Sequence, residues 1–113
     1  MNDNKPMKIL FQISESEKIP LSFIAVKNMA NMEGVDNVIA LYSETGIYGV
    51  LRNEEENIKQ LLSNPKIQVY ACGVAMKSNN LAEKDFASGV KVAPISFYEI
   101  AKWQRDGYIY LRL

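Results

Sequence analysis

Residues 38–42, Val-Ile-Ala-Leu-Tyr, form an apolar run without the polar alternation of a half-exposed strand. Such a run is typical of a strand covered on both faces, as in a parallel sheet. Four more short apolar segments are spaced along the chain: Met7–Ile13, Ile67–Ala71, Val90–Ala93 and Tyr108–Leu113. Helical patterns lie between them and are long enough for crossovers, so the chain predicts an α/β fold with a parallel sheet and helices on both faces.

Local signals suggest where the helices begin and end. Pro20 suits the first turn of one helix, and Gly34 is a natural stop after it. Two capping-box patterns predict further helix starts, one at Asn53 with Glu56 and one at Ser96 with Glu99.

Length and charge narrow the protein class. The 113 residues fit one domain, 1–113, with residues 1–6 as a flexible N-terminus. Thirteen basic and thirteen acidic residues cancel, and no basic block stands out, so no nucleic-acid partner is expected. No segment reaches the ~20 apolar residues of a membrane span, and no signal-peptide pattern opens the chain. A single cysteine agrees with a reducing compartment, so we expect a cytoplasmic protein that does not bind membranes.

The chain lacks the residues that several kinds of catalytic, metal and cofactor site require. The chain has no histidine, which excludes Ser-His-Asp and Cys-His arrangements within one chain. One cysteine without histidine leaves zinc without soft ligands, so no metal site is expected. Neither a Walker loop nor Gly-x-Gly-x-x-Gly occurs, and no cofactor is expected.

Cys72 follows the third predicted strand directly, and functional groups gather past the carboxyl ends of strands in open parallel sheets. Gly73 permits a sharp turn there. A helix beginning after it would offer free N–H groups that favour a thiolate over a thiol, and Lys77 would add positive charge. The alternative is that Cys72 is a small buried apolar residue, as lone cysteines usually are.

The order of several motifs resembles the DsrE/DsrF-like family. That family typically shows an Ala-Cys-Gly motif after a strand, a Gly-Val-x-Val strand, and a Gln-x-x-Gly-aromatic-x-Tyr ending. The matching residues here are Ala71-Cys72-Gly73, Gly89-Val90-Lys91-Val92, and Gln104 with Gly107-Tyr108-Ile109-Tyr110. Earlier, Lys8–Ile13 resembles the first strand of the family, and Val26–Met29 resembles its helix with an asparagine, here Asn28.

The resemblance implies a three-layer α/β/α domain with a mainly parallel five-stranded sheet. It also implies homo-oligomers, often trimers or hexamers. In the sulfur-relay members, the cysteine of this motif carries a persulfide from a donor protein to an acceptor protein, and Cys72 would inherit that role. The protein would then be a sulfur carrier or a sulfurtransferase-type subunit at most.

Some site positions depart from the family or have a second interpretation. Many single-domain relatives carry polar residues such as Asn-Thr after the Cys-Gly pair, whereas this chain has Val74-Ala75. Stabilisation of a sulfur anion would therefore come from backbone N–H groups or from Lys77. Asn28 is a candidate for shaping the site by bonding a nearby loop; the alternative is a buried amide that the backbone satisfies.

Two other functions remain open. The chain could be a non-catalytic oligomeric module that binds a small molecule or a protein, with Cys72 as the floor of a pocket. It could also be a thiol redox sensor that forms disulfides between molecules.

Overall fold

A computed structural model describes residues 5–113. Most of the expected flexible N-terminus, residues 1–4, lies outside the described residues. The strands are β1 (Met7–Ile13), β2 (Val35–Tyr42), β3 (Ile67–Cys72), β4 (Lys91–Ala93) and β5 (Tyr108–Arg112). The α-helices are α1 (Ile19–Ala30), α2 (Glu55–Leu62), α3 (Gly73–Ser78) and α4 (Ser96–Arg105). Short 3₁₀ helices cover Ser16–Lys18, Glu44–Val50, Arg52–Glu54 and Glu83–Asp85.

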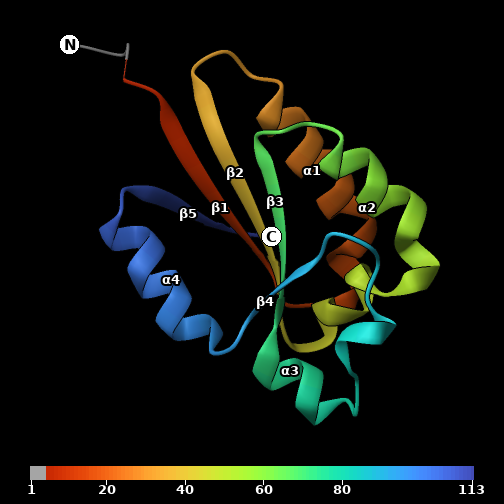
Figure 1. The fold of residues 1–113 in the computed structure, drawn as a ribbon. Coiled ribbons are helices and arrows are strands. Elements are labelled where there is room, and N and C mark those ends of the chain that lie inside the picture. Colours follow the sequence, from red (N-terminus) through yellow and green to blue (C-terminus); the bar gives the residue numbers. More distant parts are fainter. Residues whose placement is uncertain (1–4) are drawn as a thin grey trace.

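The strands form one sheet in the order β4-β3-β2-β1-β5. Every pairing is parallel, which confirms the predicted α/β architecture. The chain steps outward from β1 through β2 and β3 to β4, and then returns across the sheet to place β5 on the other side of β1 (Figure 1). All carboxyl ends of the strands therefore meet at one edge of the sheet.

The helices form two outer layers. Helices α1 and α2 cover one face of the sheet, and α4 alone covers the other (Figure 1). The larger core lies under α1 and α2, where every second residue of the central strands is buried. Its fully buried members include Ile13, Val26, Val38, Ala40, Tyr42, Ile58, Val69 and Ala71. Because burying each CH₂ contributes about 0.8 kcal/mol, this core is a large source of the driving force for folding.

A smaller core lies under α4. Leu10, Ile39 and Leu41 point to this face of the sheet, and Trp103 of α4 packs against them. The Trp103 ring lies edge-on to Tyr70, with 5.1 Å between the ring centroids. The α4 layer is thereby fixed on the sheet by aromatic contact as well as by aliphatic burial.

Neither predicted capping box forms. Helix α2 begins at Glu55 after a 3₁₀ turn, and Asn53 lies inside that turn instead of capping the helix. Helix α4 begins at Ser96 itself, so Ser96 is its first helical residue; the N-cap position belongs to Ile95, whose side chain makes no cap bond. Each predicted helix start is thus displaced by one residue, and the Ser96 hydroxyl is not used as a cap.

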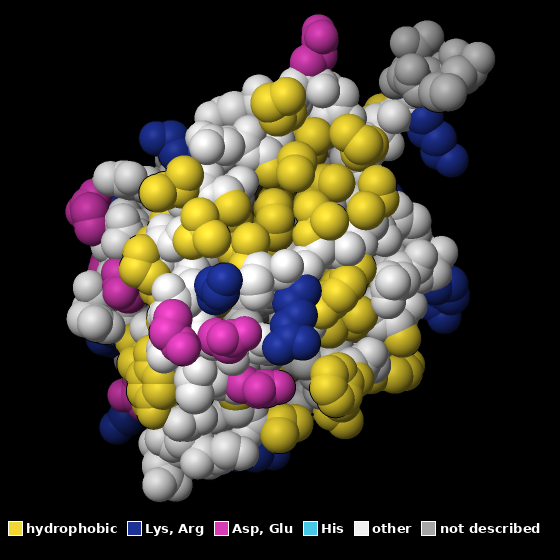
Figure 2. Space-filling model, turned by 180° about the vertical axis from the view of Figure 1, so that it is seen from behind, with side chains coloured by type: hydrophobic (Ala, Val, Ile, Leu, Met, Phe, Trp, Pro, Cys, Tyr) yellow, Lys and Arg dark blue, Asp and Glu magenta, His cyan; other side chains and the backbone are white. Residues whose placement is uncertain are grey.

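Several large apolar side chains remain on the surface. Figure 2 shows hydrophobic side chains gathered on the side of the molecule that faces away from the viewer in Figure 1. The exposed residues include Leu21 and Ile24 of α1, Met32 in the turn after α1, and Ile109 and Leu111 of β5. Within residues 5–113, no helix has the length and apolar character that crossing a bilayer would require.

Candidate functional site

The site lies between the carboxyl ends of β3 and β4. After β3 the chain enters α3, whose Ala75 packs with the core on the α1 face. After β4 the chain enters α4 on the opposite face. Adjacent strands whose connections leave to opposite faces open a crevice at their carboxyl ends, and this is where open α/β sheets bind ligands.

Cys72 is the last residue of β3 and the N-cap residue of α3. Its backbone is still extended (φ −71°, ψ 122°), and its Sγ accepts a hydrogen bond from the Ala75 N–H at 3.5 Å. The residue is only 6% exposed and belongs to the core, but it also borders a pocket. The cysteine is thus packed on one side and faces a cavity on the other.

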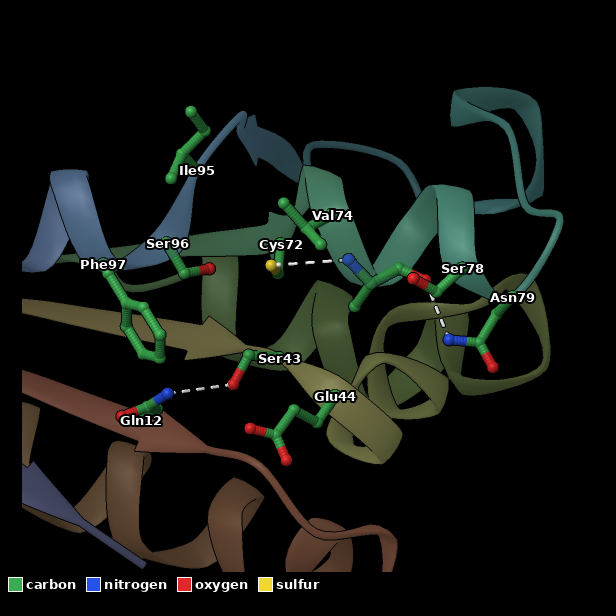
Figure 3. Close-up of a pocket in the computed structure, with 11 residues that line it drawn as sticks. Gln12, Ser43, Glu44, Cys72, Val74, Ser78, Asn79, Ile95, Ser96 and Phe97 are labelled. Carbon is green, nitrogen blue, oxygen red and sulfur yellow. Dashed lines mark hydrogen bonds between the residues drawn. The ribbon is translucent and has the colours of Figure 1, made fainter.

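The pocket at this crevice has a volume of about 350 Å³ (Figure 3). Its walls come from the ends of four strands and from the segments that follow them. The lining residues are Gln12, Ser43, Glu44, Cys72, Val74, Ala75, Ser78, Asn79, Ile95, Ser96 and Phe97. Most of the surface that lines the pocket is apolar, although six of the eleven residues have polar side chains, and this mixture is usual for a small-molecule site.

A buried polar chain forms one side of the pocket. The Gln12 Nε2 donates to Ser43 Oγ at 3.0 Å, and the Tyr110 hydroxyl donates to Gln12 Oε1. Gln12 is 7% exposed and Ser43 is 3% exposed. The bond from Gln12 holds Ser43 Oγ as an acceptor, so the Ser43 hydroxyl hydrogen can turn toward the pocket.

Ser96 forms the opposite side. Its Oγ is buried and has no hydrogen-bond partner among the described residues. Figure 3 shows this oxygen directed across the pocket toward the sulfur of Cys72. A buried hydroxyl without a partner is uncommon in native proteins and requires an explanation.

Gly73 brings the two halves of the site close together. A Cβ at this position would lie 2.8 Å from the Pro94 carbonyl oxygen and 2.9 Å from the Pro94 Cα. In the strand before it, Cys72 pairs with Ala93 of β4. Glycine is needed here for close approach of two backbones, rather than for the sharp turn expected from the sequence.

The other predicted site residues lie elsewhere. Lys77 is exposed on α3 and does not line the pocket. Asn28 is exposed on α1, so it is neither a pocket residue nor the buried amide of the alternative interpretation. Glu44 is the only residue with a formally charged side chain in the pocket lining, and it is exposed.

Sequence reasoning missed most of the polar pocket residues. Gln12 and Ser43 were not singled out, although each is a polar residue at the carboxyl end of an apolar run, and that position is the signal that points to them. The spacing of Ser96 and Glu99 predicts a helix cap instead of a pocket residue. Among residues 5–113, no group of three or more potential metal ligands comes together.

This geometry defines a class of protein: a parallel α/β/α domain with a thiol and a pocket at the carboxyl ends of its strands. The model of the DsrE/DsrF-like family matches residues 7–113, so the chain belongs to that family. No curated protein matches the sequence.

Two solved structures share the fold. One is the protein of unknown function MTH1491 from Methanobacterium thermoautotrophicum, with a TM-score of 0.82 and 20% identity; the match covers 95% of this chain and 99% of that one. The other is the YchN protein from E. coli, with a TM-score of 0.60 and 13% identity; the match covers 95% of this chain and 100% of that one. At these identities the likeness concerns the fold alone.

Proposed function

We propose that the protein carries sulfur inside the cell and that Cys72 holds it as a persulfide. The observation that supports this most directly is the place of the thiol. Cys72 ends a strand at the crevice between β3 and β4, borders a pocket of about 350 Å³, and accepts an amide hydrogen bond at its sulfur. The chain belongs to the DsrE/DsrF-like family. In the sulfur-relay members of that family the cysteine of this motif carries a persulfide, which agrees with the proposal.

The proposed transfer has two balanced steps. The Cys72 thiolate attacks the outer sulfur of a donor persulfide, R–S–SH; a new S–S bond forms on Cys72, and the donor leaves as R–S⁻. An acceptor thiolate then attacks the outer sulfur on Cys72 and breaks that S–S bond. Cys72 leaves as a thiolate, and no external oxidant or reductant is consumed.

The Ala75 N–H serves both steps. Cys72 Sγ carries negative charge before the first step and again after the second, when it is the leaving group. An N–H directed at that sulfur stabilises the charge in both states. Because this donor belongs to the backbone, the hydrogen bond to the sulfur is kept even though this chain has Ala75 where many relatives have a polar side chain.

Mass spectrometry tests the carrier role. We expect the wild-type protein, treated with polysulfide or with a cysteine desulfurase and cysteine, to gain the mass of one sulfur atom on Cys72. Cys72→Ser should gain none, because the chain contains no other cysteine. Wild-type protein that gains no sulfur, or a serine variant that gains as much, would contradict the proposal.

A non-catalytic binding module is the second candidate, and the size of the pocket favours it. The cavity has room for more than a single sulfur atom, and its apolar wall includes Val74, Ile95 and Phe97. In this case Cys72→Ser would retain all ligand and partner binding. A redox sensor, the third candidate, would instead form disulfide-linked dimers after mild peroxide treatment, visible by non-reducing electrophoresis.

Self-association as a trimer or hexamer is part of the proposal, and the apolar surface supports it. Tyr108 and Tyr110 of β5 lie on the α4 side of the sheet, so alternation turns Ile109 and Leu111 to the α1 side. These two side chains are 46% and 36% exposed at an edge strand, which a second copy of the chain would cover.

A further inference from the structure

Ser96 has a hydroxyl with nothing to bond in the described part of the chain. The residue is 6% exposed, its Oγ lacks a partner, and the oxygen lies in the wall of the pocket that contains Cys72. Ser14 is the other buried serine in this condition, but it does not line the pocket. Burial without a hydrogen bond is unfavourable, so an occupant of the pocket that accepts from Ser96 would remove the cost.

The start of α4 adds further donors at the same place. The helix runs for ten residues from Ser96, and its first internal bond joins Glu99 N–H to Ile95 O at 3.1 Å. The N–H groups of Ser96 and Phe97 precede that bond and have no partner within the helix. No side chain caps them, and because Ser96 and Phe97 both line the pocket, the positive end of the helix dipole lies at the pocket wall.

The backbone fixes these donors relative to the sulfur. Cys72 pairs with Ala93, and Gly73 packs on Pro94, so the junction between β4 and α4 lies against the end of β3. The Ala75 N–H already binds Sγ itself. A second sulfur bonded to Sγ would extend about 2 Å further and need donors of its own.

We propose that Ser96 Oγ–H and the first backbone N–H groups of α4 bind the anionic outer sulfur of the Cys72 persulfide. This inference rests on the proposed carrier function and adds the hydrogen-bond donors that bind the transferred sulfur atom. The outer sulfur accepts hydrogen bonds from Ser96 and α4, while the inner sulfur keeps its bond from Ala75. Besides the persulfide anion itself, Glu44 is the charged group in the pocket lining, and because it is exposed its carboxylate is solvated.

The test compares Ser96→Ala with Ser14→Ala, a matched loss of a buried, unpartnered hydroxyl outside the pocket. Each protein is loaded with polysulfide, and the rate at which iodoacetamide alkylates the persulfide is followed against pH. Losing a hydrogen bond to the anion should raise the half-maximal pH of Ser96→Ala by about one unit, a tenfold change in the protonation equilibrium. Ser14→Ala should follow the wild type.

Amide NMR of the wild-type protein gives a second readout that needs no substitution. Spectra are recorded after loading and again after cyanide has removed the outer sulfur. We expect the largest reversible shifts at the amides of Ser96 and Phe97. Shifts confined to Gln12 and Ser43, or identical pH profiles for Ser96→Ala and the wild type, would overturn this inference alone. Wild-type protein that takes up no sulfur would overturn the proposed function as well.

Discussion

Gly73 lies so close to Pro94 that a methyl group on its Cα would stand 2.8 Å from the Pro94 carbonyl oxygen. The contact joins the first residue of α3 to the residue that follows β4, so it holds Cys72, which precedes Gly73, close to the segment that leads into Ser96. Both contacting atoms on Pro94 belong to the backbone, so a side-chain rotation cannot relieve the overlap.

Gly73→Ala should therefore destabilise the fold and distort the pocket. We expect a loss of about 1–3 kcal/mol in the free energy of unfolding, because the β4–α4 junction must move. Denaturant unfolding followed by Trp103 fluorescence measures it. The adjacent exposed residue provides the control, since Val74→Ala should change stability by less than about 0.5 kcal/mol. Equal stability of Gly73→Ala and the wild type would contradict the close contact.

The Gln12 amide should matter more than its small volume suggests. Gln12→Met keeps the length of the side chain but removes the bonds to Ser43 and Tyr110, leaving two hydroxyls without this partner. A cost of about 1–3 kcal/mol is expected in denaturant unfolding. Gln68→Met is a matched change on β3, where the amide is only partly buried, and should cost clearly less. If the two variants were equally stable, the polar chain would not be a stabilising element.

Phe97 should control access to the sulfur without supporting the fold. Its side chain is 76% exposed although the residue lines the pocket. Phe97→Ala is expected to leave stability within about 0.5 kcal/mol and to increase the alkylation rate of Cys72 several-fold. Tyr98→Ala, an exposed aromatic that does not line the pocket, should leave the rate unchanged. A similar rise in both variants would point to general loosening of α4.

Tyr42 should make the protein sensitive to alkaline pH. Burial raises the pKa of Tyr42 well above its usual range, an effect only partly offset by its hydrogen bond with Ser22 at 2.8 Å. Above about pH 10 an unfolded tyrosine releases its proton whereas folded Tyr42 keeps it, so stability present below this pH falls as pH rises.

Tyr42→Phe tests this expectation by urea unfolding between neutral and alkaline pH. Because the variant lacks the hydrogen bond with Ser22, its free energy of unfolding should be about 1 kcal/mol lower at neutral pH. Its stability should then fall less steeply than that of the wild type above about pH 10. Burial also raises the pKa values of Tyr70 and Tyr108, which remain in both proteins and contribute equally. Parallel pH curves for the two proteins would rule out Tyr42 as the source.

A charge on β5 should separate the proposed subunits. Ile109→Asp places a carboxylate on the exposed α1 side of the edge strand and should yield a monomer in analytical ultracentrifugation. The control variant Tyr98→Asp, at an exposed position on α4, should leave the oligomer intact. A wild-type protein that sediments as a monomer would show that this surface does not mediate self-association.

The sequence was sufficient to predict the strands because their apolar runs are short, dense and bounded by polar residues. The order of strands was not predictable, since pairing depends on contacts between residues far apart in the chain. The first residue of each helix was harder to predict than the strands. Ser96 and Asn53 have the spacing of capping residues, but the N-cap positions belong to the neighbouring residues Ile95 and Glu54.

The candidate site was only partly predictable for the same reason. Cys72 could be placed at a strand end from its neighbours alone, and the structure shows it there. The side chains that face it come from three other segments, so Gln12, Ser43 and Ser96 become neighbours only once the sheet is assembled. Positive charge suggested Lys77, and the resemblance to the family helix suggested Asn28, but both residues are exposed and neither lines the pocket.

Strand β4 has three residues and pairs with the sheet on one side only. Few hydrogen bonds therefore need to break for this strand to detach, and the other four strands can stay paired while it does. Such detachment would carry Ser96 away from Cys72 and widen the crevice enough for a bulky acceptor. In the proposed sulfur transfer, local opening of this short edge strand, rather than global unfolding, would set how often Cys72 meets an acceptor protein.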